Sequence, residues 1–221
     1  MNDGTDSNPT RNFLVRAWRL FWSPTARFSA GTLLAGGLVA GVLFWGGFHW
    51  SMELSNKEAF CISCHEMEEN VYKELQGTVH FANRTGIRAF CADCHVPKEW
   101  LFKVRRKIYA TNELLHKALG TVDTPEKFEA QRMKMAVSVW NTMKSTDSRE
   151  CRNCHANVWM DLTKQFGGAQ RNHEIAMKNE LTCIDCHQGI AHRLPKDFVR
   201  PKSDQLTKDP NAWLDTLKAR Q

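Results

Sequence analysis

No cysteine in this 221-residue chain lies outside one repeated pattern, and no segment shows ordinary strand alternation of apolar and polar residues. The eight cysteines form four Cys-x-x-Cys pairs, which leaves no isolated thiol. The lack of strand patterning argues against a β-rich fold. A mainly α-helical chain with much irregular structure is therefore predicted.

The segment 28–50 contains no Asp, Glu, Lys or Arg and is rich in Leu, Val, Ala, Gly and Phe. At about 1.5 Å per residue such a helix is about 35 Å long, enough for a hydrocarbon core of about 30 Å. No small-x-small cleavage site follows it in residues 48–53, which argues against a cleaved signal peptide. We expect a single-pass transmembrane helix over 28–50, preceded by a basic segment over 1–27.

Charge and aromatic residues around this span predict its orientation. By the positive-inside rule, four preceding arginines keep the amino terminus in the cytoplasm and send everything after residue 50 to the outer side of the membrane. His49 is interpreted as an interfacial side chain at the outer edge. The arginines are Arg11, Arg16, Arg19 and Arg27, and the two aromatic belts are Trp18, Phe21 and Trp22, and Phe44, Trp45, Phe48 and Trp50.

A histidine follows each cysteine pair at once, which is the attachment signature of c-type haem. Zinc sites would not require a histidine after every second cysteine, and disulfides would not require four similar pairs. Four covalently bound haem c groups are therefore predicted. The thioether cysteines are Cys61, Cys64, Cys91, Cys94, Cys151, Cys154, Cys183 and Cys186, and the histidines that follow are His65, His95, His155 and His187.

The formal net charge of +6 does not indicate a nucleic-acid partner. The four arginines, together with Asp3 and Asp6, lie before the haem motifs and leave 26 basic and 22 acidic residues for 51–221. Four haems would add eight propionates, which more than balance that excess. We expect no nucleic-acid binding.

The motifs are spaced as two pairs, which indicates a duplicated dihaem unit. The first cysteines are 30 residues apart in the first pair and 32 in the second, with 60 between the pairs. His80 and His173 recur at matching places and are predicted as distal iron ligands. His192 is a further candidate, and for His116 exposure or a propionate contact is the favoured interpretation. The predicted haem domain covers 51–195, with units over about 55–120 and 145–195, and a polar tail over 196–221.

Two helices are predicted between the dihaem units. Apolar residues at helical spacing indicate one over 99–119, which stops at Gly120. Thr124 as cap and Pro125 in the first turn begin the second. Both apolar stripes are expected to pack on haem faces. They comprise Leu101, Val104, Ile108, Leu115 and Leu119 in the first helix, and Phe128, Met135, Val139, Trp140 and Met143 in the second.

Four motifs follow the anchor: Cys61-Ile-Ser-Cys64-His65-Glu-Met67, Cys91-Ala-Asp-Cys94-His95-Val-Pro97, Cys151-Arg-Asn-Cys154-His155 and Cys183-Ile-Asp-Cys186-His187-Gln-Gly-Ile-Ala-His192. Together with the anchor, they closely resemble the NapC/NirT family of tetrahaem quinol dehydrogenases. The resemblance covers about 18–195. It implies a protein of the bacterial inner membrane, with its haem domain in the periplasm, that oxidises menaquinol or ubiquinol. It is strongest to the branch that supplies periplasmic nitrate reductase through a dihaem cytochrome subunit.

The resemblance also implies site residues. Met67 would ligate the first iron, with His65 as the ordinary alternative. An acidic and a basic residue on the helix after motif two would contact the quinol, and Glu113 with Arg106 or Lys107 match best. Arg106, Tyr109, Glu113 and His116 share one non-apolar stripe, for which a solvated face with propionate contacts is the other interpretation.

Two rival functions stay open at this stage. The same quinol chemistry could serve nitrite reductase or several periplasmic reductases. A terminal multihaem reductase is a different class, but every motif ends in histidine and none marks a substrate haem. The sequence leaves the oligomeric state undetermined.

Overall fold

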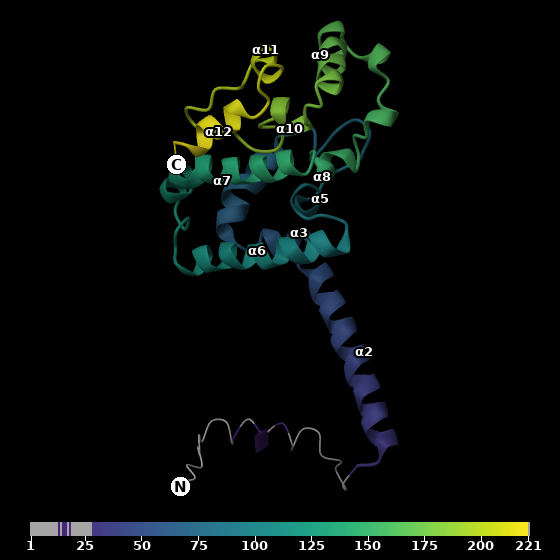
Figure 1. Ribbon diagram of the computed structural model, residues 1–221. Helices are drawn as coiled ribbons and strands as arrows, with labels where there is room; N and C mark the ends of the chain where they lie inside the picture. Colours follow the sequence, from purple (N-terminus) through teal and green to yellow (C-terminus); the bar gives the residue numbers. More distant parts are fainter. Residues whose placement is uncertain (1–12, 14, 17, 19–27, 221) are drawn as a thin grey trace, which may run out of the picture. The chain divides into compact units, whose positions relative to one another are not determined.

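The computed structural model describes residues 13, 15, 16, 18 and 28–220, and its ribbon is drawn in Figure 1. Of the residues singled out above, Asp3, Asp6, Arg11, Arg19, Phe21, Trp22 and Arg27 lie outside the described residues. The described part is helical and contains no strand, which confirms the predicted fold class. It divides into two compact units, residues 1–52 and 53–221.

The elements follow one another in chain order, and four short helices begin, contain or end at a haem motif. They are α2 (Ala30–Leu54), α3 (Glu58–Cys61), the π-helix η1 (Met67–Tyr72), α4 (Lys73–Gln76), α5 (Cys91–His95), α6 (Trp100–Ala118), α7 (Pro125–Ser145), α8 (Arg149–Arg152), the 3₁₀ turns η2 (Asn157–Trp159) and η3 (Leu162–Lys164), α9 (Gly167–Lys178), α10 (Cys183–Cys186), α11 (Ser203–Leu206) and α12 (Ala212–Lys218).

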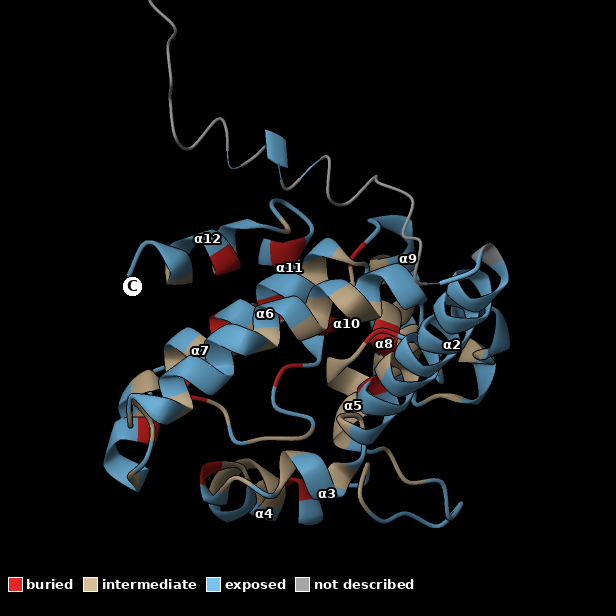
Figure 2. Cartoon of the chain, turned by 90° about the horizontal axis from the view of Figure 1, so that it is seen from below, coloured by how far each residue is buried: buried red, intermediate tan, exposed pale blue. Residues whose placement is uncertain are grey.

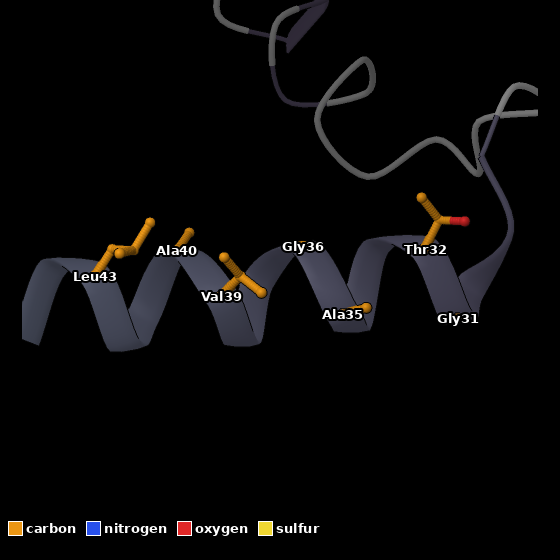
Figure 3. Close-up of a pocket in the computed structure, with 7 residues that line it drawn as sticks. All are labelled: Gly31, Thr32, Ala35, Gly36, Val39, Ala40 and Leu43. Carbon is orange, nitrogen blue, oxygen red and sulfur yellow. The ribbon is translucent and has the colours of Figure 1, made fainter.

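Helix α2 is long and apolar enough to span a bilayer by length and composition, over Gly31–Leu54. Residues 31–47 are exposed all round, so α2 is not the core helix of a soluble domain. Small residues leave an open groove along one side (Figure 3). Its lining is Gly31, Thr32, Ala35, Gly36, Val39, Ala40 and Leu43.

Helices α6 and α7 confirm the two helix predictions. Glu99 and Leu119 cap α6, while Thr124 caps α7 by accepting a hydrogen bond at Oγ1 from Lys127 N over 3.3 Å. Pro125 occupies the first turn of α7, where its missing N–H leaves no bond unmade. Gly120 adopts φ +62°, a left-handed conformation that favours glycine and ends α6.

The buried face of α7 differs in part from the predicted stripe. Phe128 and Trp140 are buried as expected, whereas Val137 and Arg132 replace Met135 and Val139 as the other buried positions. Arg132 was missed because sequence patterns favour apolar residues inside, and an arginine is buried only when carboxylates pair with it.

The carboxy-terminal segment corrects a prediction. Residues 196–221 were expected to form a polar tail, but Leu206 and Leu214 are only 1% and 2% exposed. Leu214 joins Val137, Trp140 and Ile184 in the apolar cluster of the domain. The segment thus packs on α7 and motif four, and its few apolar residues were too widely spaced to reveal this. Figure 2 shows that few of the described residues are buried.

Candidate functional site

Six histidines form three pairs of neighbouring rings. Each pair joins a motif histidine to one of the predicted distal histidines, which sequence spacing alone could not match to one another. The ring centres are 6.3 Å apart for His155 and His80, 6.2 Å for His95 and His192, and 6.0 Å for His187 and His173.

This geometry fits axial ligation of iron. A metal–imidazole bond is about 2 Å long and the ring centre lies about 1 Å behind the nitrogen, so two rings across one ion have centres about 6 Å apart. A ligating imidazole must be neutral. Burial, reinforced by the charges of His192 and Arg106, lowers the pKa of His95 to about 4. Burial likewise lowers the pKa of His187.

A glutamine orients one of these rings. His173 Nδ1 lies 2.5 Å from Gln165 Oε1, so Nδ1–H can donate to the amide oxygen and leave Nε2 for a metal. Sequence reasoning missed Gln165, because its role depends on the turn that carries it back toward α9.

Motif one departs from the other three. His65 has no ring partner within the described part of the chain, its side chain is 60% exposed, and its Nε2 lies 3.4 Å from Glu66 Oε1. Met67 is half-buried and opens η1. A π-helix is rare, and it often marks a functional position. The local backbone at motif one therefore differs from that at the three histidine pairs.

The first cysteines of the two motifs in each pair lie next to one another, in both pairs. Cys61 lies beside Cys91, and Cys151 lies beside Cys183. The neighbouring thiol lowers the pKa of Cys61 to about 7 and that of Cys183 to about 6, and it raises the pKa of the partner thiols. All eight cysteines are free of disulfides.

The second motif of each pair has a further common feature. Asp93 Oδ2 accepts from Phe90 N, and Asp185 Oδ2 accepts from Thr182 N, both over 2.9 Å. Each aspartate thereby caps the helical turn that presents its two cysteines. Motifs two and four therefore share the same local backbone contact.

The predicted quinol residues lie on one helix, α6. Arg106 Nη2 is 2.7 Å from Glu113 Oε1, so these two side chains meet as the stripe predicted. Arg106 also donates from Nε to the carbonyl of His95 over 3.1 Å. His116 is placed elsewhere in its contacts, with Nδ1 3.1 Å from Thr121 Oγ1.

Lys107, the other basic candidate, contacts the chain just before motif one. Its Nζ donates to the carbonyl of Ser55 over 2.9 Å, and it interacts electrostatically with the Cys61 thiol. Burial lowers the pKa of Lys107. Of the two basic candidates, Lys107 is thus the one beside the first attachment site.

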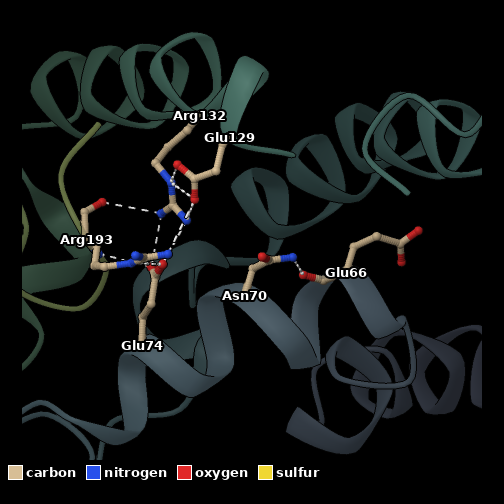
Figure 4. A network of polar contacts seen from close by, with 6 residues as sticks. All are labelled: Glu66, Asn70, Glu74, Glu129, Arg132 and Arg193. Carbon is tan, nitrogen blue, oxygen red and sulfur yellow. Dashed lines mark hydrogen bonds and ion pairs between the residues drawn. The ribbon is translucent and has the colours of Figure 1, made fainter. Parts of the chain in front are cut away.

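An ionic network built on two buried side chains, Glu74 and Arg132, lies beside His192 and was not predicted. Figure 4 shows Glu74 of α4 in ion pairs with Arg132 of α7 and with Arg193 of the loop after motif four. Arg132 Nη2 lies 2.8 Å and Arg193 Nε 2.7 Å from Glu74 Oε1, and Arg193 N donates to Glu74 Oε2 over 3.0 Å. Glu129 Oε1 completes the network, 2.6 Å from Arg132 Nη2.

A second buried carboxylate follows motif one directly. Glu66 is 3% exposed and receives Lys117 Nζ at 2.5 Å. Burial works to raise the pKa of Glu66, but Lys117 prevails and the pKa is lowered. Lys117 therefore holds the end of α6 to motif one.

Comparison with known proteins agrees with these features. Residues 23–197 match the family described as "NapC/NirT cytochrome c family, N-terminal region". The "Denitrification system component NirT" of Stutzerimonas stutzeri is 51% identical over 82% of this chain and 90% of its own. "Cytochrome c-type protein NapC" is 49% identical in Paracoccus pantotrophus (89% and 85%) and 50% in Escherichia coli K12 (86% and 94%).

No solved structure matches the chain. The family match covers all four motifs, the three histidine pairs and α6, and it ends before α11. On this evidence the chain belongs to the NapC/NirT cytochrome c family and carries covalently bound haem.

Proposed function

We propose that this chain is a membrane-anchored tetrahaem cytochrome that oxidises membrane quinol and passes electrons to a periplasmic reductase. The three histidine pairs are the observation that carries this proposal, because they would provide paired axial ligands at motifs two, three and four. We assign four haem c groups to the eight cysteines. Bound haem supplies one-electron redox chemistry.

The anchor is assigned to α2, with the amino terminus in the cytoplasm and the haem domain in the periplasm of the inner membrane. The support is the apolar, fully exposed surface of residues 31–47 and the arginines before it, including Arg16. The proposed domain plan is a basic segment over 1–27, the membrane helix over 28–50 and a haem domain from residue 51, with dihaem units over about 55–120 and 145–195 and the segment 196–221 packed on that domain.

At the first motif we assign Met67 as the axial ligand of iron. The absence of a ring facing His65 among the described residues supports this assignment, and His65 is the alternative. A thioether ligand would give this position a different potential from the three histidine pairs.

The quinol residues are assigned to α6. Oxidation of quinol releases two protons with two electrons, so a proton acceptor must stand near the entry site. Lys107 Nζ, beside Cys61, would donate a hydrogen bond to a quinol oxygen. Glu113 would take up a proton once Arg106 releases its carboxylate. The solvent-exposed Glu113 side chain can then return that proton to water.

For the acceptor we propose the periplasmic nitrate reductase complex, reached through its dihaem cytochrome subunit. The NapC relatives support this choice, and the NirT relative favours a second candidate, an acceptor in a denitrification system. Stopped-flow reoxidation of the reduced protein by each purified acceptor separates the two.

The overall proposal is tested in liposomes that contain the purified protein and a reduced quinone. The haem absorbance should change on mixing, and intact-mass analysis should show four added haem groups. Reduction by dithionite but not by quinol would contradict the proposed function, and fewer than four haems would contradict the cofactor assignment.

A further inference from the structure

Helix α6 is amphipathic, but its apolar side faces outward. Four aliphatic residues recur at spacings of seven, seven and four, which places them on one stripe of a helix. They are Leu101 (74% exposed), Ile108 (64%), Leu115 (54%) and Leu119 (67%).

The basic side of α6 faces the protein. Lys103 Nζ lies 2.8 Å from Glu53 Oε1, and Lys107 Nζ donates to the Ser55 carbonyl. Arg106 donates to the His95 carbonyl, and Lys117 binds the buried Glu66. At about 100° per residue, these basic residues point away from the aliphatic stripe. In water this orientation of α6 would be unfavourable, because it exposes aliphatic side chains to solvent and turns the charged side chains away from it.

Bound haem does not account for the exposed stripe. Two groups of the attachment motifs interact with its basic side, where Arg106 donates to the His95 carbonyl and Lys107 interacts electrostatically with the Cys61 thiol. The stripe lies on the opposite side of the helix. The sequence-based expectation that these residues pack on haem faces therefore lacks support in the contacts of α6.

The edge of the stripe has the composition of a lipid–water boundary. Arg105 stacks over the ring of Tyr109, with its Cζ 5.4 Å from the ring centre, and Tyr109 is 59% exposed. Cationic and aromatic side chains beside an apolar stripe are typical of helices that lie in a bilayer interface.

The attachment of α6 to the rest of its unit points to the same partner. Lys103 and Lys107 bind residues 53 and 55, at the place where the chain enters the haem domain from α2. A protein partner or a second copy of this chain would not require α6 to be fastened at that point, whereas a bilayer surface would.

We propose that α6 lies in the lipid–water interface, with Leu101, Ile108 and Leu115 inserted among the acyl chains. This inference rests on the proposed anchoring of the chain through α2. It gives the haem domain a second membrane contact, formed by a helix that also bears the proposed quinol residues.

Photolabelling tests this directly. The full chain with its haems is placed in nanodiscs of phosphatidylcholine and phosphatidylglycerol that contain a lipid with a diazirine on its acyl chain. After illumination and digestion, mass spectrometry should find lipid adducts on peptides from α2 and α6. Peptides from α7 and α12 serve as the internal negative control. Labelling on α6 should recur every three to four residues along the exposed stripe.

The outcomes separate this inference from the function proposed above. If α2 is labelled and α6 is not, the proposed interfacial position of α6 is wrong, and something other than lipid covers the stripe. Labelling of neither helix removes the anchor as well. Quinol-dependent reduction, measured on the same nanodiscs, reports on the function independently.

A matched pair of variants strengthens the test. Ile108→Ser should lower labelling of α6, because the burial of one aliphatic side chain favours the inserted state by roughly tenfold in its equilibrium constant. Val199→Ser changes a residue that is 84% exposed outside α6, and it should leave the labelling unchanged. Equal labelling of α6 in both variants would contradict the insertion of this stripe.

Discussion

The rings of His95 and His192 lie nearly parallel, with centres 6.2 Å apart and planes inclined by 22°. One belongs to motif two and the other follows motif four, so the two predicted dihaem units meet at this pair. The pair of His155 and His80 joins the units in the reverse direction. Only His173 and His187 belong to the same unit. Neither unit can therefore complete its set of imidazole pairs alone.

Loss of His192 should convert one low-spin site to high spin. In His192→Ala the imidazole of His95 would have no partner, so optical and paramagnetic resonance spectra should show one high-spin iron. Added imidazole should restore the low-spin signal, which distinguishes a missing ligand from misfolding. The control is His116→Ala, which removes a histidine bound to Thr121 and should leave the spectra unchanged. A fully low-spin His192→Ala protein would refute the pairing.

Glu74 should act on the iron of motif two by positioning His192. Glu74→Gln removes the charge that holds Arg193 beside that ligand, and loss of such supporting contacts weakens metal ligation by about 10- to 100-fold. The expected readouts are a shifted midpoint potential and an altered low-spin signal for one haem. Glu69→Gln removes an exposed carboxylate paired with Lys73 and should change neither.

The same carboxylate gives a pH dependence. Burial works to raise the pKa of Glu74, but Arg132 and Arg193 prevail and lower it. Its contribution to stability is therefore present above the ordinary pKa of about 4.3 and is lost as the pH falls through the lowered value. The difference in thermal midpoint between wild type and Glu74→Gln should shrink on acidification below about pH 4. A constant difference would mean that the carboxylate charge is not what matters.

The iron of motif one should differ from the other three. Paramagnetic resonance of the oxidised protein should show three bis-histidine sites and one distinct site that Met67→Leu alters selectively. The ring planes are 76° apart for His80 and His155 but 24° apart for His173 and His187, so the bis-histidine signals themselves should differ in shape. Four bis-histidine signals would exclude Met67 as a ligand.

Sequence reasoning reached the features that depend on local chain geometry. The limits of α6 and the Thr124 cap follow from spacing and turn chemistry, and both are confirmed. It selected the histidines that the structure pairs, but it could not pair them, because partners such as His95 and His192 are brought together only by the fold. The ionic network around Glu74 was missed for the same reason: Arg132 and Arg193 reach it from distant segments.

Glu113 and Lys107 should be separable by their effects on quinol oxidation. Glu113→Gln removes the proposed proton acceptor and should slow quinol-dependent reduction by about 100-fold or more, the usual value of general base catalysis. Lys107→Met should chiefly raise the quinol concentration needed for half-maximal rate. Dithionite reduction should be unchanged in both. Glu126→Gln, an exposed glutamate on α7, is the control. Unchanged quinol kinetics in Glu113→Gln would remove Glu113 from the mechanism.

The folded carboxy-terminal segment should stabilise motif four. Leu214 is 2% exposed within the apolar cluster, and its neighbour Trp213 donates from Nε1 to Asp185 Oδ1 over 3.0 Å. Because a buried leucine leaves a cavity when truncated, Leu214→Ala should cost about 3 kcal/mol of unfolding free energy. Val199→Ala, at an 84% exposed position in the same segment, should cost far less. Thermal unfolding followed by haem absorbance measures both, and equal midpoints would mean that the segment contributes nothing to the fold around motif four.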